Sequence, residues 1–138
     1  MTAENSSLKI IIVDDSPDDQ FFIKKALWHF KNIKCQSFYY PEKFLDYISS
    51  LKMTELPDMV IIDINMPRLT GFEVIEIARR LDDEDQIKFF ILTSALTEID
   101  KCNCKRLNVE CFTKPFTPHE FKMTIQNMVT KWKLEKAG

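Results

Sequence analysis

Short apolar runs alternate along this chain with segments of helical periodicity. Leu8–Val13 and Met59–Ile62 are the clearest runs, being almost continuously apolar and rich in β-branched residues. Such runs are typical of parallel strands, which are buried on both faces. Further extended segments are expected over 33–39, 87–93 and 109–113. The alternation predicts an α/β fold in which helices cover both faces of a five-stranded parallel sheet, with right-handed crossovers.

Capping residues indicate where the helices begin. Ser16 precedes Pro17, which suits a first helical position, and the acidic residues Asp18 and Asp19 complement the helix dipole. A threonine followed three residues later by an acidic residue opens three further helices, at Thr70–Glu73, Thr97–Asp100 and Thr117–Glu120. Another helix is expected from residue 41 to about residue 51.

Length and composition exclude several classes of protein. A chain of 138 residues fits one domain, so we expect a flexible tail over 1–7, a folded unit over 8–135 and no output domain. A net charge of −2 offers no positive field for nucleic acid, and two glycines cannot form a G-x-G-x-x-G or P-loop phosphate cradle. No apolar run reaches the roughly 20 residues of a membrane span, and the start lacks signal-peptide features, so we expect a cytoplasmic location.

The four cysteines do not indicate a metal site. Cys102 and Cys104 are separated by a single residue, which is closer than the ligand pairs of structural zinc sites, and no histidine lies near them. We therefore expect Cys35, Cys102, Cys104 and Cys111 to be reduced and mostly structural thiols in a reducing compartment.

Polar residues follow the predicted strands at their carboxyl ends, where parallel sheets bind ligands. These residues are Asp14 and Asp15 after the first strand, Asp63 after the third, Thr93 and Ser94 after the fourth, and Lys114 and Pro115 after the fifth. Clustered carboxylates favour a hard cation such as Mg²⁺. A free aspartate oxygen beside Mg²⁺ can attack phosphorus, while a lysine and a threonine stabilise the phosphoryl oxygens.

Four motifs in this order resemble the receiver domains of response regulators, over about residues 8–132. They are Val13-Asp14-Asp15-Ser16, Ile62-Asp63-Ile64-Asn65-Met66-Pro67 with Gly71 following, Leu92-Thr93-Ser94 and Thr113-Lys114-Pro115-Phe116. The resemblance implies a flavodoxin-like doubly wound sheet in the order 2-1-3-4-5. It implies that Asp63 is the phosphoacceptor and binds Mg²⁺ together with Asp15 and the backbone carbonyl of Asn65. Asp14 would act through a metal-bound water, and Thr93 and Lys114 would contact the phosphoryl group.

The same resemblance implies partners rather than a substrate. A sensor histidine kinase or histidine phosphotransfer protein would donate the phosphoryl group, and a downstream protein would bind the face of the fourth helix, fifth strand and fifth helix. A homodimer is compatible with this arrangement, whereas nucleic acid and membrane are not expected. As a stand-alone, chemotaxis-regulator-like receiver, the chain would catalyse only its own phosphorylation and dephosphorylation.

Two details concern the supporting residues. The resemblance implies a cis peptide between Lys114 and Pro115. Receivers often carry Tyr or Phe three residues before the lysine, where this chain has Cys111. With no ring to turn inward, we expect phosphorylation to displace the segment 94–97, beginning at Ser94, and the helix that follows it.

Two other functions are compatible with parts of this pattern. A receiver fold can serve as a phosphorylation-independent interaction module, although such modules usually lack the acidic residues present here. A small aspartate-nucleophile phosphohydrolase would also use Mg²⁺, but its Asp-x-Asp-x-Thr motif is replaced here by Asp14-Asp15-Ser16-Pro17.

Overall fold

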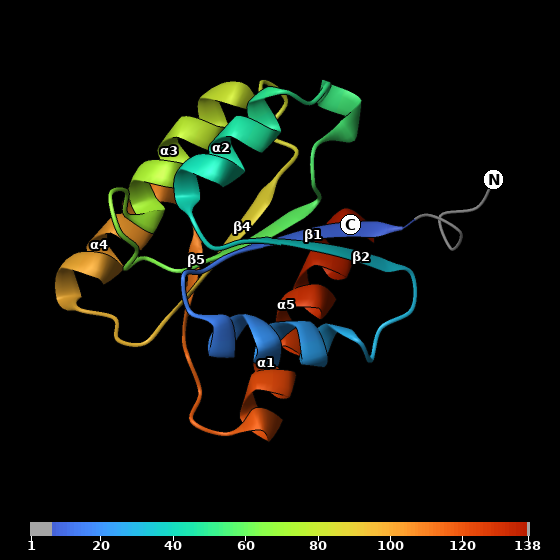
Figure 1. Ribbon diagram of the computed structural model, residues 1–138, viewed down its shortest axis with the longest axis vertical. Coiled ribbons are helices and arrows are strands. Elements are labelled where there is room, and N and C mark those ends of the chain that lie inside the picture. Colours follow the sequence, from blue (N-terminus) through green and yellow to red (C-terminus); the bar gives the residue numbers. More distant parts are fainter. Residues whose placement is uncertain (1–6, 138) are drawn as a thin grey trace.

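A single sheet of five parallel strands lies between two layers of helices in the computed structural model, which describes residues 7–137 (Figure 1). The strands are β1 (Leu8–Val13), β2 (Ile33–Phe38), β3 (Met59–Ile62), β4 (Lys88–Thr93) and β5 (Glu110–Thr113). The helices are α1 (Pro17–Leu27), α2 (Pro41–Ser49), α3 (Gly71–Leu81), α4 (Glu98–Leu107) and α5 (Pro118–Ala137), with a short 3₁₀ helix, η2 (Met53–Glu55). The strand order β2-β1-β3-β4-β5 confirms the predicted fold class.

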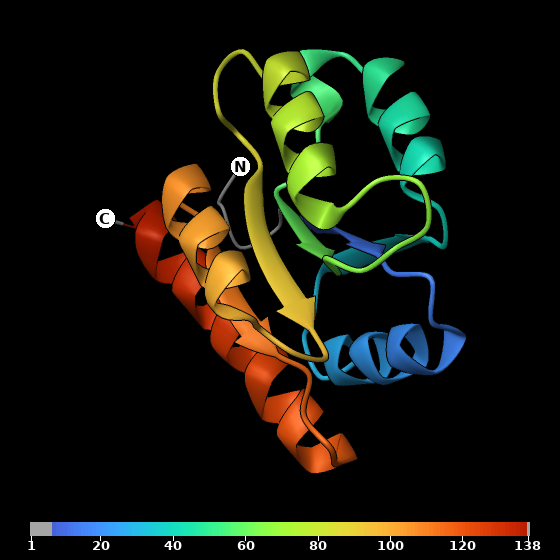
Figure 2. The same cartoon turned by 90° about the vertical axis from the view of Figure 1, so that its left-hand side faces the viewer.

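The sheet buries side chains on both faces, which explains why its central strands are continuously apolar. Ile10 and Ile12 of β1 pack in the cluster that α1 and α5 cover, whereas Ile11 and Val13 pack in the cluster beneath α2, α3 and α4. Figure 2 shows the two helical layers on opposite sides of the sheet, with α4 along the β5 edge. Alternation along each strand therefore supplies both cores.

Local hydrogen bonds explain where β4 and β5 begin. The fourth strand begins at Lys88 instead of residue 87, because the backbone N–H of Ile87 donates to the side chain of Asp82 at 2.8 Å. The fifth strand begins at Glu110, because the N–H of Val109 donates to the Cys104 carbonyl as part of the end of α4. The second strand and second helix end earlier than predicted, and η2 was not anticipated.

The predicted helix caps at Ser16, Thr70 and Thr97 are formed. At Thr117 the hydroxyl accepts from the N–H of Glu120 at 3.1 Å, and it also donates to the Glu120 carboxylate. That carboxylate was expected to accept from the backbone N–H of Thr117 instead.

Three further expectations concern the N-terminal tail, a membrane-spanning helix and a cis peptide. The tail predicted over 1–7 lies outside the described residues, apart from Ser7. No helix within 7–137 is long and apolar enough to cross a membrane. The cis peptide expected before Pro115 is wrong, because no cis bond occurs in the described part of the chain. The trans form is the intrinsic preference of X–Pro bonds, and Lys114 reaches its partners with it.

Candidate functional site

Sheet register brings the carboxyl ends of four strands together. Val13 of β1 pairs with Ile62 of β3, so the residues that follow them, Asp14 and Asp63, are neighbours. Thr93 of β4 pairs with Thr113 of β5, and the N–H of the next residue, Lys114, donates to the Thr93 carbonyl at 2.7 Å. The sequence-predicted strand-end residues therefore meet at one edge of the sheet.

The Lys114 ammonium is the centre of this cluster. Its Nζ lies 2.9 Å from Asp14 Oδ2, 2.8 Å from Asp63 Oδ2 and 2.7 Å from Asp19 Oδ2. Burial by itself would lower the pKa of Lys114, but hydrogen bonds with Asp19, Asp63 and Asp14 outweigh it, so the pKa is raised and the ammonium stays charged. One buried cation is thus shared by three carboxylates.

Asp14 is the most buried carboxylate of the site, and its burial affects its pKa. Burial raises its pKa from 3.8 to about 6, against the opposing effects of the Lys114 hydrogen bond and of the Ser16 N–H, which donates to Asp14 Oδ1 at 2.9 Å. The charge of Asp63 raises the pKa further. The site therefore carries more negative charge than Lys114 neutralises.

A divalent cation fits this excess of carboxylate oxygens. Asp14, Asp15 and Asp63 each place one oxygen within 4.8 Å of the others, with Asp15 exposed to solvent. The N–H of Asn65 donates to Asp63 Oδ1 at 3.2 Å, which keeps the Asn65 backbone beside the carboxylate. An all-oxygen set that is open on one side is typical of Mg²⁺ sites, where several positions stay free for water or phosphate.

Thr93 and Ser94 differ in their surroundings. Thr93 is fully buried, and its Oγ1 has no hydrogen-bond partner among residues 7–137. A buried hydroxyl without a partner is costly, so this oxygen is a candidate to donate to a bound ligand. Ser94, the next residue, is exposed.

Asp19 and Gln20 belong to the site, although the sequence interpretation assigned Asp19 only to the helix dipole and did not consider Gln20. Asp19 lies in the first turn of the helix that begins directly after Asp14 and Asp15, and this closeness in sequence was the available signal. Gln20 is buried, and its Nε2 donates to the carbonyls of Asp14 and Phe38 at 2.8 and 2.9 Å. It thereby ties the segment after β1 to the end of β2.

Gly71 holds the segment after β3 in place. Its N–H donates to the Ile64 carbonyl at 2.9 Å. A Cβ at this position would lie 2.4 Å from the Asp63 carbonyl oxygen, which is closer than any real contact. Only glycine therefore allows α3 to begin this close to the backbone of Asp63.

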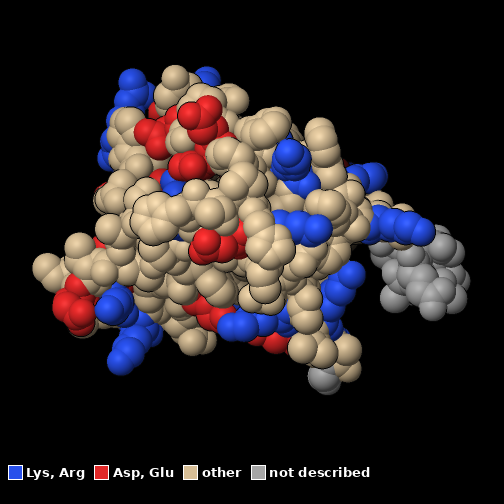
Figure 3. Space-filling view, turned by 90° about the horizontal axis from the view of Figure 1, so that it is seen from below, with Lys and Arg blue, Asp and Glu red and all other residues tan. Residues whose placement is uncertain are grey.

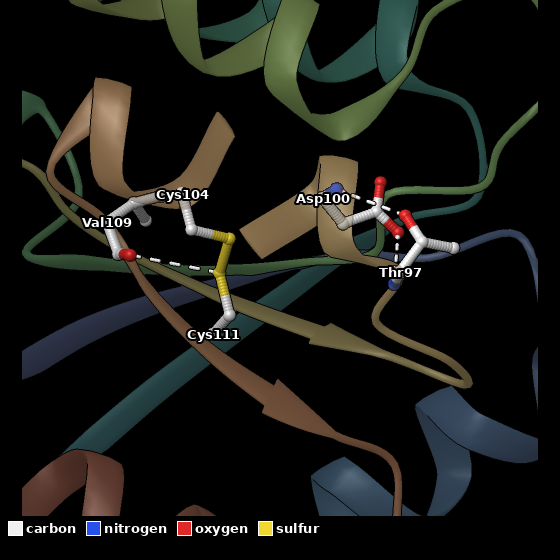
Figure 4. The surroundings of a disulfide bond; sticks show 5 residues. All are labelled: Thr97, Asp100, Cys104, Val109 and Cys111. Carbon is white, nitrogen blue, oxygen red and sulfur yellow. Dashed lines mark hydrogen bonds between the residues drawn. A yellow bond between two sulfur atoms is a disulfide. The ribbon is translucent and has the colours of Figure 1, made fainter. Parts of the chain in front are cut away.

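The expectation of four reduced cysteines is wrong for two of them. Cys104 in α4 and Cys111 in β5 form a disulfide, whereas Cys35 and Cys102 are free and exposed (Figure 4). The chain reverses through Asn108, whose φ of 53° is left-handed, and this brings the Cα atoms to 6.6 Å, within the range that a disulfide spans. The expectation of reduced thiols rested on a reducing compartment and on the ligand spacing of zinc sites. Neither carries information about the turn at Asn108 that brings the two cysteines together.

Comparisons with known proteins agree with this geometry. The family model described as "Response regulator receiver domain" matches residues 10–126 of the chain. Hybrid signal transduction histidine kinase D of Dictyostelium discoideum is 25% identical over 130 residues, covering 92% of this chain and 8% of the relative. Response regulator SaeR of Staphylococcus aureus is 30% identical over 77 residues, covering 55% of this chain and 33% of the relative. The chain thus spans well under two thirds of these curated relatives.

Solved structures show the same fold. The phosphorylated cyanobacterial phytochrome response regulator RcpA superimposes with a TM-score of 0.81 at 19% identity, covering 92% of this chain and 94% of its own. A CheY-like receiver domain protein from Methanospirillum hungatei JF-1 gives a TM-score of 0.72 at 20% identity, covering 94% and 99%. Taken with the family match over residues 10–126, this shows that the chain belongs to the response regulator receiver domain family.

Proposed function

We propose that this receiver domain accepts a phosphoryl group on Asp63 in a Mg²⁺-dependent reaction and signals by protein contact. The observation that carries the proposal is the position of Asp63 at the end of β3, which lies between β1 and β4 in the sheet. Asp63 therefore lies with Asp14 and Asp15 in one carboxylate cluster and is paired with the Lys114 ammonium, while Thr93, with its buried hydroxyl, ends the neighbouring strand β4. A phosphoryl group on Asp63 would have cationic and hydroxyl donors around its oxygens.

Each group of the site has a role in the transfer. Asp14, Asp15, Asp63 and the backbone carbonyl of Asn65 would hold Mg²⁺, Asp14 through a water, and the bound ion supplies positive charge that offsets the phosphoryl oxygens. An Asp63 oxygen attacks the phosphorus of a phosphohistidine, and the P–N bond breaks with its electron pair returning to the imidazole. Lys114 exchanges part of its contact with Asp63 for a phosphoryl oxygen, and Thr93 donates its hydroxyl to another.

Proteins are the partners that suit this domain. The phosphoryl donor would be a histidine kinase or a histidine phosphotransfer protein, and the relatives that are a hybrid histidine kinase and a phosphorylated response regulator support this. We place the downstream partner on the face of α4, β5 and α5, and the domain in the cytoplasm as a signalling module. In the view of Figure 3, acidic and basic groups of the described residues are interspersed rather than gathered into a basic patch, and the net charge is −2.

Acetyl phosphate tests the proposal without a kinase. Incubation with Mg²⁺ should add the mass of one phosphoryl group to the wild-type protein, and chelation of the metal should prevent it. Asp63→Asn should gain nothing, whereas the matched control Asp18→Asn, at an exposed position of α1, should behave as wild type. If Asp63→Asn still gains the phosphoryl mass, the assignment of the acceptor is wrong.

A further inference from the structure

Helix α4 is weakly attached to the rest of the domain. Cys104 is the only buried residue among its ten, whereas α3 buries five of its eleven. Arg79 of α3 donates to the Leu107 carbonyl at the end of α4. The ion pair of Arg106 with Glu76 also joins α4 to α3, but the two side chains are 55% and 38% exposed, and pairs so open to solvent contribute little. Elements with so little buried surface open at low free energy.

The disulfide is therefore a main attachment of this helix. It joins Cys104 in the last turn of α4 to Cys111, which pairs with Ile91 of β4 inside the sheet. Figure 4 shows the bond crossing from the helix to the strand. While it is intact, the end of α4 cannot move separately from β5.

Both oxidation states of the pair fit their surroundings. Cys104 is packed in the apolar cluster beneath α2 and α3, where a thiol behaves as a small hydrophobic group. Cys111 Sγ lies 3.8 Å from the Val109 carbonyl oxygen, which can accept from the thiol once the disulfide is reduced. Cys111 is half-buried whereas Cys104 is buried, so Cys111 is the more accessible of the two residues to an incoming thiolate.

The two bridged segments are both connected to the candidate phosphorylation site. Residues 94–97 run from Thr93 into α4, and β5, which contains Cys111, ends at Thr113, directly before Lys114. A movement that starts at Thr93 can reach α4 only if that helix is free to shift relative to β5. The disulfide opposes such a shift, and its reduction permits it.

We propose that Cys104 and Cys111 are a reversible redox modification site that sets whether α4 can respond to phosphorylation; the second half of this statement rests on the function proposed above. The oxidant is a low-molecular-weight disulfide such as glutathione disulfide. The Cys111 thiolate attacks it and releases one glutathione thiolate, and the Cys104 thiolate then displaces the second from Cys111. In total the two protein thiols lose two electrons and two protons, and the glutathione disulfide becomes two thiols.

The test uses the full chain with Cys35→Ser and Cys102→Ser, so that only this pair remains. Alkylation and mass spectrometry across a series of glutathione ratios should show the pair passing between dithiol and disulfide without denaturant. Amide hydrogen exchange over residues 98–107 should be about tenfold faster or more in the reduced form. Beryllofluoride, a mimic of the phosphoryl group, should change this exchange in the reduced form and leave the oxidised form unchanged.

Two variants separate this inference from the proposed function. Cys111→Ser should exchange like the reduced protein under both oxidising and reducing conditions. Asp63→Asn should lose the beryllofluoride effect and keep the difference in α4 exchange between the reduced and oxidised forms. Failure of beryllofluoride to act therefore counts against phosphoryl acceptance and not against the redox site. Equal exchange of α4 in both redox forms would overturn the inference. So would a beryllofluoride effect that is present and of equal size in both forms, or a pair that keeps one state at every glutathione ratio.

Discussion

Replacing Gly71 by alanine would push directly on the backbone of Asp63. The added Cβ would lie 2.4 Å from the Asp63 carbonyl oxygen and 3.1 Å from both the Asp63 carbonyl carbon and the Ile64 Cα. All three atoms belong to the backbone, so no side-chain rotation can relieve the contact. Because ordinary contacts are roughly 3.5 Å, the start of α3 and the end of β3 must separate by about 1 Å.

The cost follows from this displacement. Overpacking of this kind destabilises by about 1–3 kcal/mol, while alanine in place of glycine returns somewhat less than about 1 kcal/mol at the first position of a helix. We expect the free energy of unfolding of Gly71→Ala to fall by about 1–2 kcal/mol, equivalent to roughly 3–8 °C in Tm. Since Asp63 itself is displaced, affinity for Mg²⁺ should fall about tenfold or more, as it does when the support of a metal ligand is lost.

Urea denaturation and a Mg²⁺ titration followed by thermal unfolding measure the two effects. Arg80→Ala is a matched control, because it places an alanine at an exposed position of the same helix. It should leave both quantities within error of the wild type. If Gly71→Ala keeps wild-type stability and Mg²⁺ affinity, close packing at Gly71 is not what positions Asp63.

Three further outcomes follow from the site and the disulfide. Millimolar Mg²⁺ should raise the Tm, by the equivalent of about 2.7 kcal/mol at a hundredfold excess over Kd, and Asp15→Ala should abolish this increase. A wild-type Tm that does not change with Mg²⁺ concentration would count against the metal site. Asp19→Ala should lower stability by about 1 kcal/mol or less, because this partner of Lys114 is 26% exposed, and should keep the response to Mg²⁺; loss of that response would make Asp19 part of the metal site. The Cys104–Cys111 bond has a sequence separation of 7 and closes an eight-residue loop, so its reduction should lower the free energy of unfolding in urea by about 2.5 kcal/mol. The stability of Cys111→Ser should not change on addition of reductant. If reductant destabilises this variant as much as the wild type, the disulfide is not the cause.

Strands buried on both faces were predictable in this chain, and marginal elements were not. The bounds of β1 and β3 and the start of α3 agree with prediction, since continuous apolar runs mark the strands and the Thr70–Glu73 capping box marks the helix start. Residues 53–55 form a 3₁₀ helix of a single turn, too short to show any periodicity. Ile87 is apolar and precedes β4 directly, but its N–H donates to the Asp82 side chain instead of to a neighbouring strand.

In the candidate site, too, some contacts were predictable from the sequence and others were not. The meeting of Asp14, Asp63 and Lys114 followed from parallel topology alone, because each residue ends a strand at one edge of the sheet. The contact of Asp19 with Lys114 depends on how α1 is rotated over that edge, which strand order does not specify. The pairing of Cys104 with Cys111 depends on a left-handed residue between a helix and a strand, and the spacing of two cysteines carries no sign of it.

The chemical identity of the phosphorylated residue is the most direct test of the account. Borohydride reduces an acyl phosphate to the alcohol, so a phosphorylated aspartate is left as homoserine, which peptide mass spectrometry locates. After incubation with acetyl phosphate and Mg²⁺, the account predicts homoserine at Asp63 and at no other acidic residue of the site. Homoserine at Asp14, Asp15 or Asp19, or a phosphate that survives borohydride on a serine or threonine, would contradict it.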